Sequence, residues 1–237
     1  AGDLAADDEV RADIRRVRLS PSSRFVDLGC GPCGILTLVL TTVRCRGTGV
    51  EFSRSALQAG RVRAASLGVD TLLTVQEADL NEPLPFAPGS FDAAMSVDVV
   101  LHLRDRLKFF REVVKVLAPG GRFLLTDAGV VTGAISNEDI RKRSARGYAE
   151  FVPMGWNERL LEMAGLRLLE TENRTASVLR HATDRAAAML RHRAELERLW
   201  GAAAFGKQQD SLETAAALSR SGALSRMMYL ADVHAAV

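Results

Sequence analysis

The sequence predicts an α/β fold in which a mostly parallel sheet carries helices on both faces. Between residues 24 and 127, short apolar segments of strand length alternate with longer segments of helical length. Such alternation is typical of parallel strands, because each crossover to the next parallel strand needs a long connection that is usually a helix. The 237 residues are 47% hydrophobic and 25% charged, which is the composition of an ordinary soluble protein. This length fits one α/β domain with an insertion better than two independent domains.

The first expected element is an amphipathic helix over residues 7–18, where Val10, Ile14 and Val17 recur at helical spacing among charged residues. A serine-proline pair ends this pattern. Residues 24–127 then form the expected core of the fold. Its expected strands are residues 24–28, 47–52, 72–77, 91–97 and 122–127, its helices are residues 35–43, 53–66 and 103–117, and residues 81–90 form a proline-rich loop.

The pattern loosens after the fifth strand. Residues 129–156 have mixed polar character with glycines as punctuation, and we expect a mobile segment that contacts the substrate. Alanine, leucine, arginine and glutamate dominate residues 180–220, which favours two helices. These helices would be a lid inserted into one domain of residues 1–237. The other expected elements are a helix over 157–164, a strand over 166–172 and a final, seventh strand over 226–233.

Composition also bears on location. The longest apolar runs, such as residues 35–40, are far shorter than the roughly 18 residues that a membrane span needs. Three cysteines are too few, and odd in number, for a secreted domain held by disulfides, and we find no basic-then-apolar leader. We therefore expect a cytoplasmic protein with no membrane association.

The most informative segment is the glycine turn, residues 26–34, with the sequence V-D-L-G-C-G-P-C-G, where a predicted strand runs into a helix. Glycines there let the chain turn sharply and let a ligand lie against the main chain. Gly29, Gly31 and Gly34 alone also fit the G-x-G-x-x-G pattern of nicotinamide and flavin enzymes. Asp27 favours another ligand, because a carboxylate at this position repels a pyrophosphate and accepts hydrogen bonds from an ammonium group. The ligand is expected to be cationic at this end.

Four further segments follow the glycine turn in a fixed order. They are Glu51-Phe52 at the end of the second strand, Asp79-Leu80 before the proline-rich loop, Phe91-Asp92 to Ser96 in the fourth strand, and L-A-P-G-G-R at residues 117–122.

Together these five motifs resemble the class I S-adenosylmethionine-dependent methyltransferases of the small-molecule type. The resemblance covers residues 24–127 and implies a Rossmann-like sheet of seven strands with S-adenosylmethionine as the cofactor. It implies that Glu51 binds both ribose hydroxyls and that Asp79 and Leu80 hold the adenine. The cofactor-binding residues that it implies are Asp27, Gly29, Cys30, Gly31, Gly34, Glu51, Phe52, Asp79, Leu80 and Ser96. The rest of the chain, where this family selects its substrate, matches only loosely.

A thiol interpretation competes with this one, because Cys30-Gly31-Pro32-Cys33 is also the motif of thioredoxin-like oxidoreductases. Against it, Gly29 stands where that family usually has tryptophan, and thiol chemistry leaves the acids at the strand ends unexplained. A zinc site is not favoured either, because the cysteine pair has no second pair and Cys45 and the four histidines lack ligand spacing. We expect no metal site.

Basic clusters at residues 141–143 and 180–198 raise the possibility of nucleic-acid binding. No aromatic stacking residues are interleaved with them, and acids dilute the second cluster. A solvated helix face is the favoured interpretation, so nucleic acid is not an expected partner.

The sequence therefore predicts methyl transfer to a small-molecule acceptor, plausibly in specialised metabolism. His102, which follows the fourth strand, is the first candidate for an acid–base residue, and Asp127, which ends the fifth strand, is the second. The alternatives are methylation of RNA or protein, and a binding protein that keeps the fold without turnover. The acceptor, the methylated atom and the oligomeric state stay open.

Overall fold

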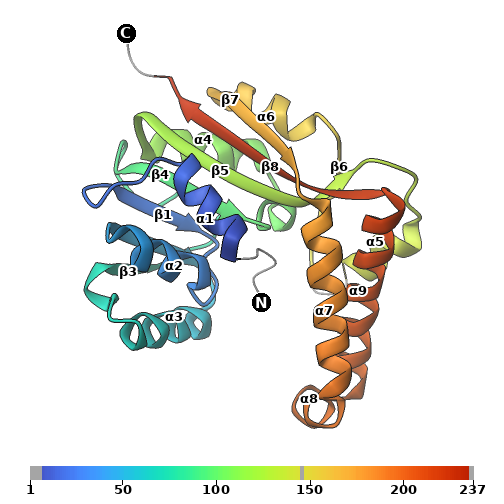
Figure 1. Cartoon of the computed structure of the whole chain (residues 1–237). Helices are drawn as coiled ribbons and strands as arrows, with labels where there is room; N and C mark the ends of the chain where they lie inside the picture. The colour runs from blue at the N-terminus through green and yellow to red at the C-terminus, as the bar shows by residue number, and fades with distance from the viewer. Residues whose placement is uncertain (1–6, 145–146, 235–237) are drawn as a thin grey trace.

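The computed structural model describes residues 7–144 and 147–234, which Figure 1 shows as one mixed α/β arrangement. Its centre is one sheet with the strand order β3-β2-β1-β4-β5-β8-β7. Strands β1 to β5 pair in parallel, and β8 runs antiparallel between β5 and β7. The predicted seven-stranded, mostly parallel sheet is confirmed, and the short strand β6 on β5 adds an eighth. The strands are β1 Arg24–Leu28, β2 Arg46–Glu51, β3 Leu73–Glu77, β4 Phe91–Val97, β5 Leu117–Val131, β6 Val152–Pro153, β7 Leu166–Asn173 and β8 Leu224–Val233.

Helices cover both faces of the sheet, as predicted. One face buries Val10 of α1 and Leu36 of α2 in an apolar cluster with Phe25 of β1. The other face buries Phe109 of α4 in a second cluster with Val26 of β1. Phe25 and Val26 belong to different clusters because successive strand residues point to opposite faces. These helices are α1 Asp7–Arg16, α2 Gly34–Val43, α3 Arg54–Ser66, α4 Arg106–Val116 and α6 Trp156–Ala164.

The segment after the fifth strand is more regular than the sequence suggests. β5 runs from Leu117 to Val131 and so continues four residues past the expected end at Asp127, because β8 pairs with it as far as Leu224. Residues 137–143 then form α5 (Asn137–Arg143), whose start is capped by Ser136. Two residues of the segment expected to be mobile, 145 and 146, lie outside the described residues.

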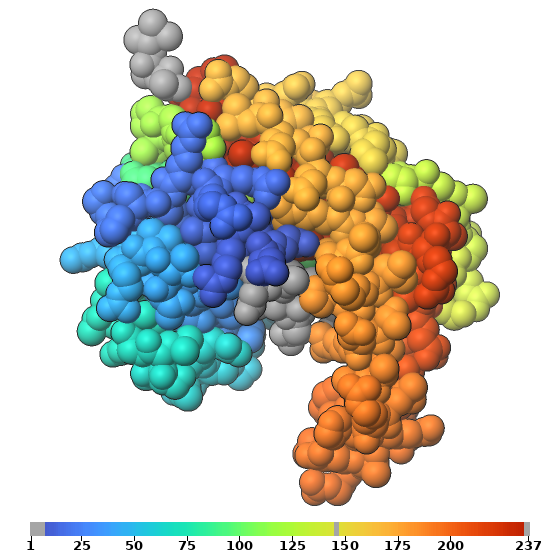
Figure 2. All heavy atoms as spheres, viewed as in Figure 1, coloured from blue at the N-terminus to red at the C-terminus, as the bar shows by residue number. Residues whose placement is uncertain are grey.

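Three helices, not two, connect β7 to β8. They are α7 Thr175–Arg191, α8 Arg193–Trp200 and α9 Ala202–Ser221, and together we call them the helical arm. The helix breaks at Gly201, whose φ of 85° is not helical. α7 and α9 pack along each other around Ala182, Met189 and Phe205 and project away from the sheet (Figures 1 and 2). Among the described residues, no helix has the length and apolar character that crossing a membrane requires.

Candidate active site

The site residues predicted from the sequence meet at one edge of the sheet. Asp27, Glu51 and Asp79 lie at or just after the carboxyl ends of β1, β2 and β3. These strands are parallel neighbours, with Leu28 opposite Val50 and Glu51 opposite Glu77. Parallel strands bring their carboxyl ends to the same edge, which is where open α/β sheets bind ligands.

The glycine turn is hydrogen-bonded to β2, and its main chain is accessible to a ligand at Gly31. The N–H groups of Gly29 and Cys30 both donate to the Val50 carbonyl, at 2.8 and 3.0 Å. A Cβ atom at Gly29, whose φ is 84°, would lie 2.4 Å from a methyl carbon of Val99. At Gly31, with φ 51°, a Cβ atom would meet no atom within 4 Å. A ligand therefore has room to lie against the main chain at Gly31.

Glu51 joins the end of β2 to this turn. Its carboxylate accepts hydrogen bonds from the N–H groups of Gly31 at 3.2 Å and Ser53 at 2.9 Å. Each carboxylate oxygen can accept more than one hydrogen bond, so Glu51 keeps the capacity to bind a hydroxyl pair. The next side chain, Phe52, is 74% exposed. Its ring is free to stack on a flat ligand.

Two other acids flank this region in different surroundings. Asp27 is only 2% exposed and lies in β1 between β2 and β4. Asp79 is exposed and accepts hydrogen bonds from the main-chain and side-chain amides of Asn81, at 2.9 and 2.8 Å. These hydrogen bonds hold the pKa of Asp79 below its ordinary value, so this carboxylate is ionised at neutral pH. Leu80 beside it is buried at 8% exposure.

Two residues predicted for the site, Ser96 and Asp127, are fully buried and bonded to other parts of the protein. Ser96 is fully buried, and its hydroxyl donates to the Leu28 carbonyl at 3.0 Å, which ties β4 to β1. Asp127 is also fully buried, and Arg106 Nη1 donates to its Oδ2 at 2.5 Å. Asn157 donates to the same oxygen, and the Gly129 N–H donates to the other, both at 2.8 Å. These contacts argue against a catalytic role for Asp127 and against ligand binding by Ser96.

The two cysteines of the turn pack inward. Their sulfur atoms are 3.6 Å apart, and both thiols are free and buried. The hydrogen bond to Cys33, together with burial, raises the pKa of Cys30. The same hydrogen bond lowers the pKa of Cys33, but Cys33 is fully buried, and a buried thiol is not accessible to a substrate disulfide. The sulfur atoms instead occupy space left by Gly49 and Gly60, where a Cβ atom would lie 2.7 and 2.5 Å from them.

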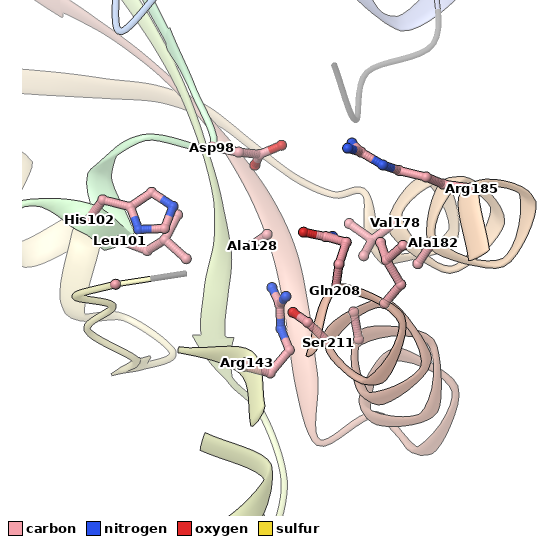
Figure 3. A pocket seen from close by; sticks show the side chains of 13 residues that line it. Asp98, Leu101, His102, Ala128, Arg143, Val178, Ala182, Arg185, Gln208 and Ser211 are labelled. Carbon is pink, nitrogen blue, oxygen red and sulfur yellow. The ribbon is translucent and has the colours of Figure 1, made fainter. Parts of the chain in front are cut away.

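A pocket lies beyond the end of β4, between the sheet and the helical arm (Figure 3). His102, in the 3-10 turn Val100–His102, lines it with an exposed side chain. Its Nδ1 lies 2.9 Å from the carbonyl oxygen of Tyr148. A carbonyl can only accept, so Nδ1 carries the hydrogen and Nε2 is the acceptor nitrogen of the neutral ring.

Asp98 is a pocket residue that the sequence analysis missed. It follows β4 directly with φ 55°, an uncommon value outside glycine. Both carboxylate oxygens accept hydrogen bonds from Nε of the buried Arg226, at 2.9 Å, and Thr126 donates to one of them at 3.0 Å. These bonds fix a carboxylate at the pocket wall (Figure 3). The available signal was an acid one residue past the end of the fourth strand.

Comparison with known proteins decides the family. Residues 26–125 match the family described as "Methyltransferase domain". Methyltransferase GfsG of Streptomyces halstedii is 30% identical over 161 residues, which cover 65% of this chain and 56% of the relative. Residues 26–125 form a methyltransferase domain of the class I S-adenosylmethionine-dependent type.

Other members of this methyltransferase class are similar over much of the chain. The 27-O-demethylrifamycin SV methyltransferase of Amycolatopsis mediterranei (strain S699) is 28% identical over 151 residues, 62% of this chain and 55% of the relative. This chain thus spans little more than half the length of these curated relatives. A solved structure, a putative sarcosine dimethylglycine methyltransferase from Galdieria sulphuraria, shares the fold with a TM-score of 0.84 at 20% identity. That match covers 98% of this chain and 85% of the other.

Proposed function

We propose that this chain transfers the methyl group of S-adenosylmethionine to a small-molecule acceptor, in specialised metabolism. The observation that carries the proposal is the open main chain at Gly31 with the Glu51 carboxylate bonded to it, inside a segment that matches the methyltransferase domain. One relative is named for its action on 27-O-demethylrifamycin SV, which supports an acceptor of natural-product type.

The residues around the glycine turn fit S-adenosylmethionine. In this proposal Asp27 accepts hydrogen bonds from the ammonium group, and Glu51 accepts them from the ribose hydroxyls. The exposed ring of Phe52 covers one face of the adenine. Asp79 and Leu80, just past the end of β3, border the edge of the adenine.

When bound, S-adenosylmethionine supplies a methyl group activated by its positively charged sulfur. The chain's own residues hold the acceptor in line with that methyl group and exclude water, and positioning of this kind supplies a large part of the rate. We assign the acceptor to the pocket beside His102. Nε2 of His102 takes the proton that the acceptor loses, and the fixed Asp98 carboxylate orients the acceptor. The helical arm and residues 129–156 both contribute pocket walls, through Val178 and Arg143, which supports their expected role as a lid.

Replacement of Glu51 by alanine tests the cofactor assignment. We expect S-adenosylhomocysteine to bind about 1.5–3 kcal/mol more weakly, the range for hydrogen bonds to a charged group, as measured by titration calorimetry. The matched control is Glu77→Ala, since Glu77 is the partner of Glu51 in β3 but is exposed and ion-paired to Arg54. Equal affinity of both variants, or tighter binding of NAD than of S-adenosylmethionine, contradicts the assignment.

The inward packing of the thiols leads to a second prediction. The double variant Cys30→Ser/Cys33→Ser should keep its affinity for S-adenosylhomocysteine within about threefold, because both sulfur atoms pack against Gly49 and Gly60 and not at the open side of the turn. Calorimetry measures this, with Glu51→Ala as the reference for a true loss of binding. A disulfide-reductase activity that disappears in the double variant would restore the redox interpretation.

A further inference from the structure

The acceptor pocket contains a cation, Arg185, for which the described residues supply no partner. Arg185 of α7 is half-buried and lines the pocket. It makes no hydrogen bond or ion pair with any residue of the described part of the chain, 7–144 and 147–234. Its guanidinium extends from α7 into the space between the arm and the side of the pocket that holds Asp98 (Figure 3).

Other arginines removed from solvent do have partners. Arg106 pairs with Asp127 at 2.5 Å, Arg174 pairs with Asp13 at 2.6 Å, and Arg226 pairs with Asp98 at 2.9 Å. Removing a guanidinium from water is costly unless an acceptor or an anion compensates. Arg185 is only partly buried and has no such partner among the described residues, so its guanidinium is available to an anion bound in the pocket.

Asp98, the acid across the pocket, does not fill this role. Both of its oxygens are bonded to Arg226, and it forms no ion pair with Arg185. The pocket contains a second cation, Arg143 of α5. Arg226 already compensates the charge of Asp98, so this carboxylate leaves the charge of Arg185 for a ligand.

The other side chains that line the pocket indicate which chemical groups the ligand carries besides its charge. Leu101 and Ala128 of the sheet side face Val178, Ala182 and Leu212 of the arm, and these side chains form an apolar surface. Gln208 and Ser211 of α9 also line the pocket, with Ser211 beside Arg143 (Figure 3). An amide and a hydroxyl can each donate a further hydrogen bond to an anion.

We propose that the methyl acceptor is an oxyanion with an apolar body, a carboxylate or a phosphate monoester, whose charged end binds Arg185. The planar guanidinium matches such groups with two parallel hydrogen bonds. The apolar body lies against the Leu101 and Val178 walls, with the nucleophile on the His102 side. This inference rests on the proposed function, since it names the acceptor class of the same site.

The test compares probes that share an eight-carbon chain and carry either an anionic or a neutral head group. Octanoate and octanamide form one pair, and octyl phosphate and octanol form the other, each titrated into the full chain with and without S-adenosylhomocysteine. We expect the anion of at least one pair to bind at least about tenfold more tightly than its neutral partner, as for a hydrogen-bonded charge pair. The pair with the larger preference distinguishes a carboxylate acceptor from a phosphate acceptor.

Variants then assign the preference to one side chain. Arg185→Gln should abolish the preference and Arg185→Lys should keep part of it. Arg180→Gln, on the same helix but exposed and outside the pocket lining, should leave it unchanged. Equal affinity for both members of each pair, no binding of any probe, or a preference that survives in Arg185→Gln overturns the inference. Binding of S-adenosylhomocysteine is measured separately, so failure of the proposed function is recognised by its absence in the unmodified chain.

Discussion

Replacing Asp127 by alanine should lower the free energy of unfolding by about 3–5 kcal/mol, the range for breaking a buried ion pair. The side chains of Asp127 and Arg106 are 0% and 1% exposed, so the variant leaves a guanidinium without its main anion. Asn157 and the Gly129 N–H lose the same acceptor. Urea unfolding followed by circular dichroism measures the change.

An exposed pair on the same sheet provides the control. Arg24 and Asp92 lie 2.7 Å apart with side chains 48% and 38% exposed, and such pairs contribute about 1 kcal/mol or less. Asp92→Ala should therefore cost much less than Asp127→Ala. If the two variants are equally stable and Asp127→Ala alone loses methyl transfer, Asp127 acts in catalysis as its expected position at a strand end suggested, and the structural role assigned here is wrong.

Asp127 also illustrates what the sequence did not predict, namely the partners of a buried carboxylate. Asp127 was expected at the end of the fifth strand, where this fold gathers site residues, but β5 continues to Val131 and places Asp127 inside the strand. The partners of the carboxylate come from α4 and α6, 21 and 30 residues away, and nothing in the local pattern brings them there. A carboxylate expected at a strand end is thus a site residue or an internal anchor depending on long-range packing, which a single sequence does not encode locally.

Strand bounds and turns were predicted well where residues close together in the sequence determine them. The bounds of β1 and β4 agree with the expected residues 24–28 and 91–97, because each is an apolar run bounded by turn residues. The glycine turn agrees as well, since Gly29 and Gly31 have the positive φ values that glycine permits. Asp98 has a positive φ without being glycine, and the bonds that hold it there come from β5 and β8.

In the helical arm, the sequence predicted the helical content but not the number or the packing of the helices. Its composition predicted helices between residues 180 and 220, and the structure has them from 175 to 221. The number of helices was wrong because the first expected helix, residues 180–200, is interrupted at His192, whose φ of −107° and ψ of 20° are not helical. The pairing of α7 with α9 depends on Ala182, Ala186 and Phe205 meeting across the arm, which helix propensity alone does not determine.

Replacing His102 by alanine should slow methyl transfer in a single turnover about a hundredfold or more, the lower end of the range for general acid–base catalysis. Nδ1 of His102 is occupied by the Tyr148 carbonyl at 2.9 Å, so Nε2 is the nitrogen that can accept a proton from the acceptor. The measurement uses saturating S-adenosylmethionine and an acceptor that the unmodified protein methylates. Affinity for S-adenosylhomocysteine should not change, because His102 lies in the acceptor pocket and not at the glycine turn.

A second variant separates proton transfer from positioning. His102→Asn keeps a donor that can reach the Tyr148 carbonyl but has no nitrogen that accepts a proton. If His102 is the base, asparagine should be as slow as alanine. If His102 only holds the 147–151 segment in place, asparagine should restore most of the rate lost in the alanine variant. A change below about threefold in both variants would leave positioning and exclusion of water as the source of catalysis, without a general base.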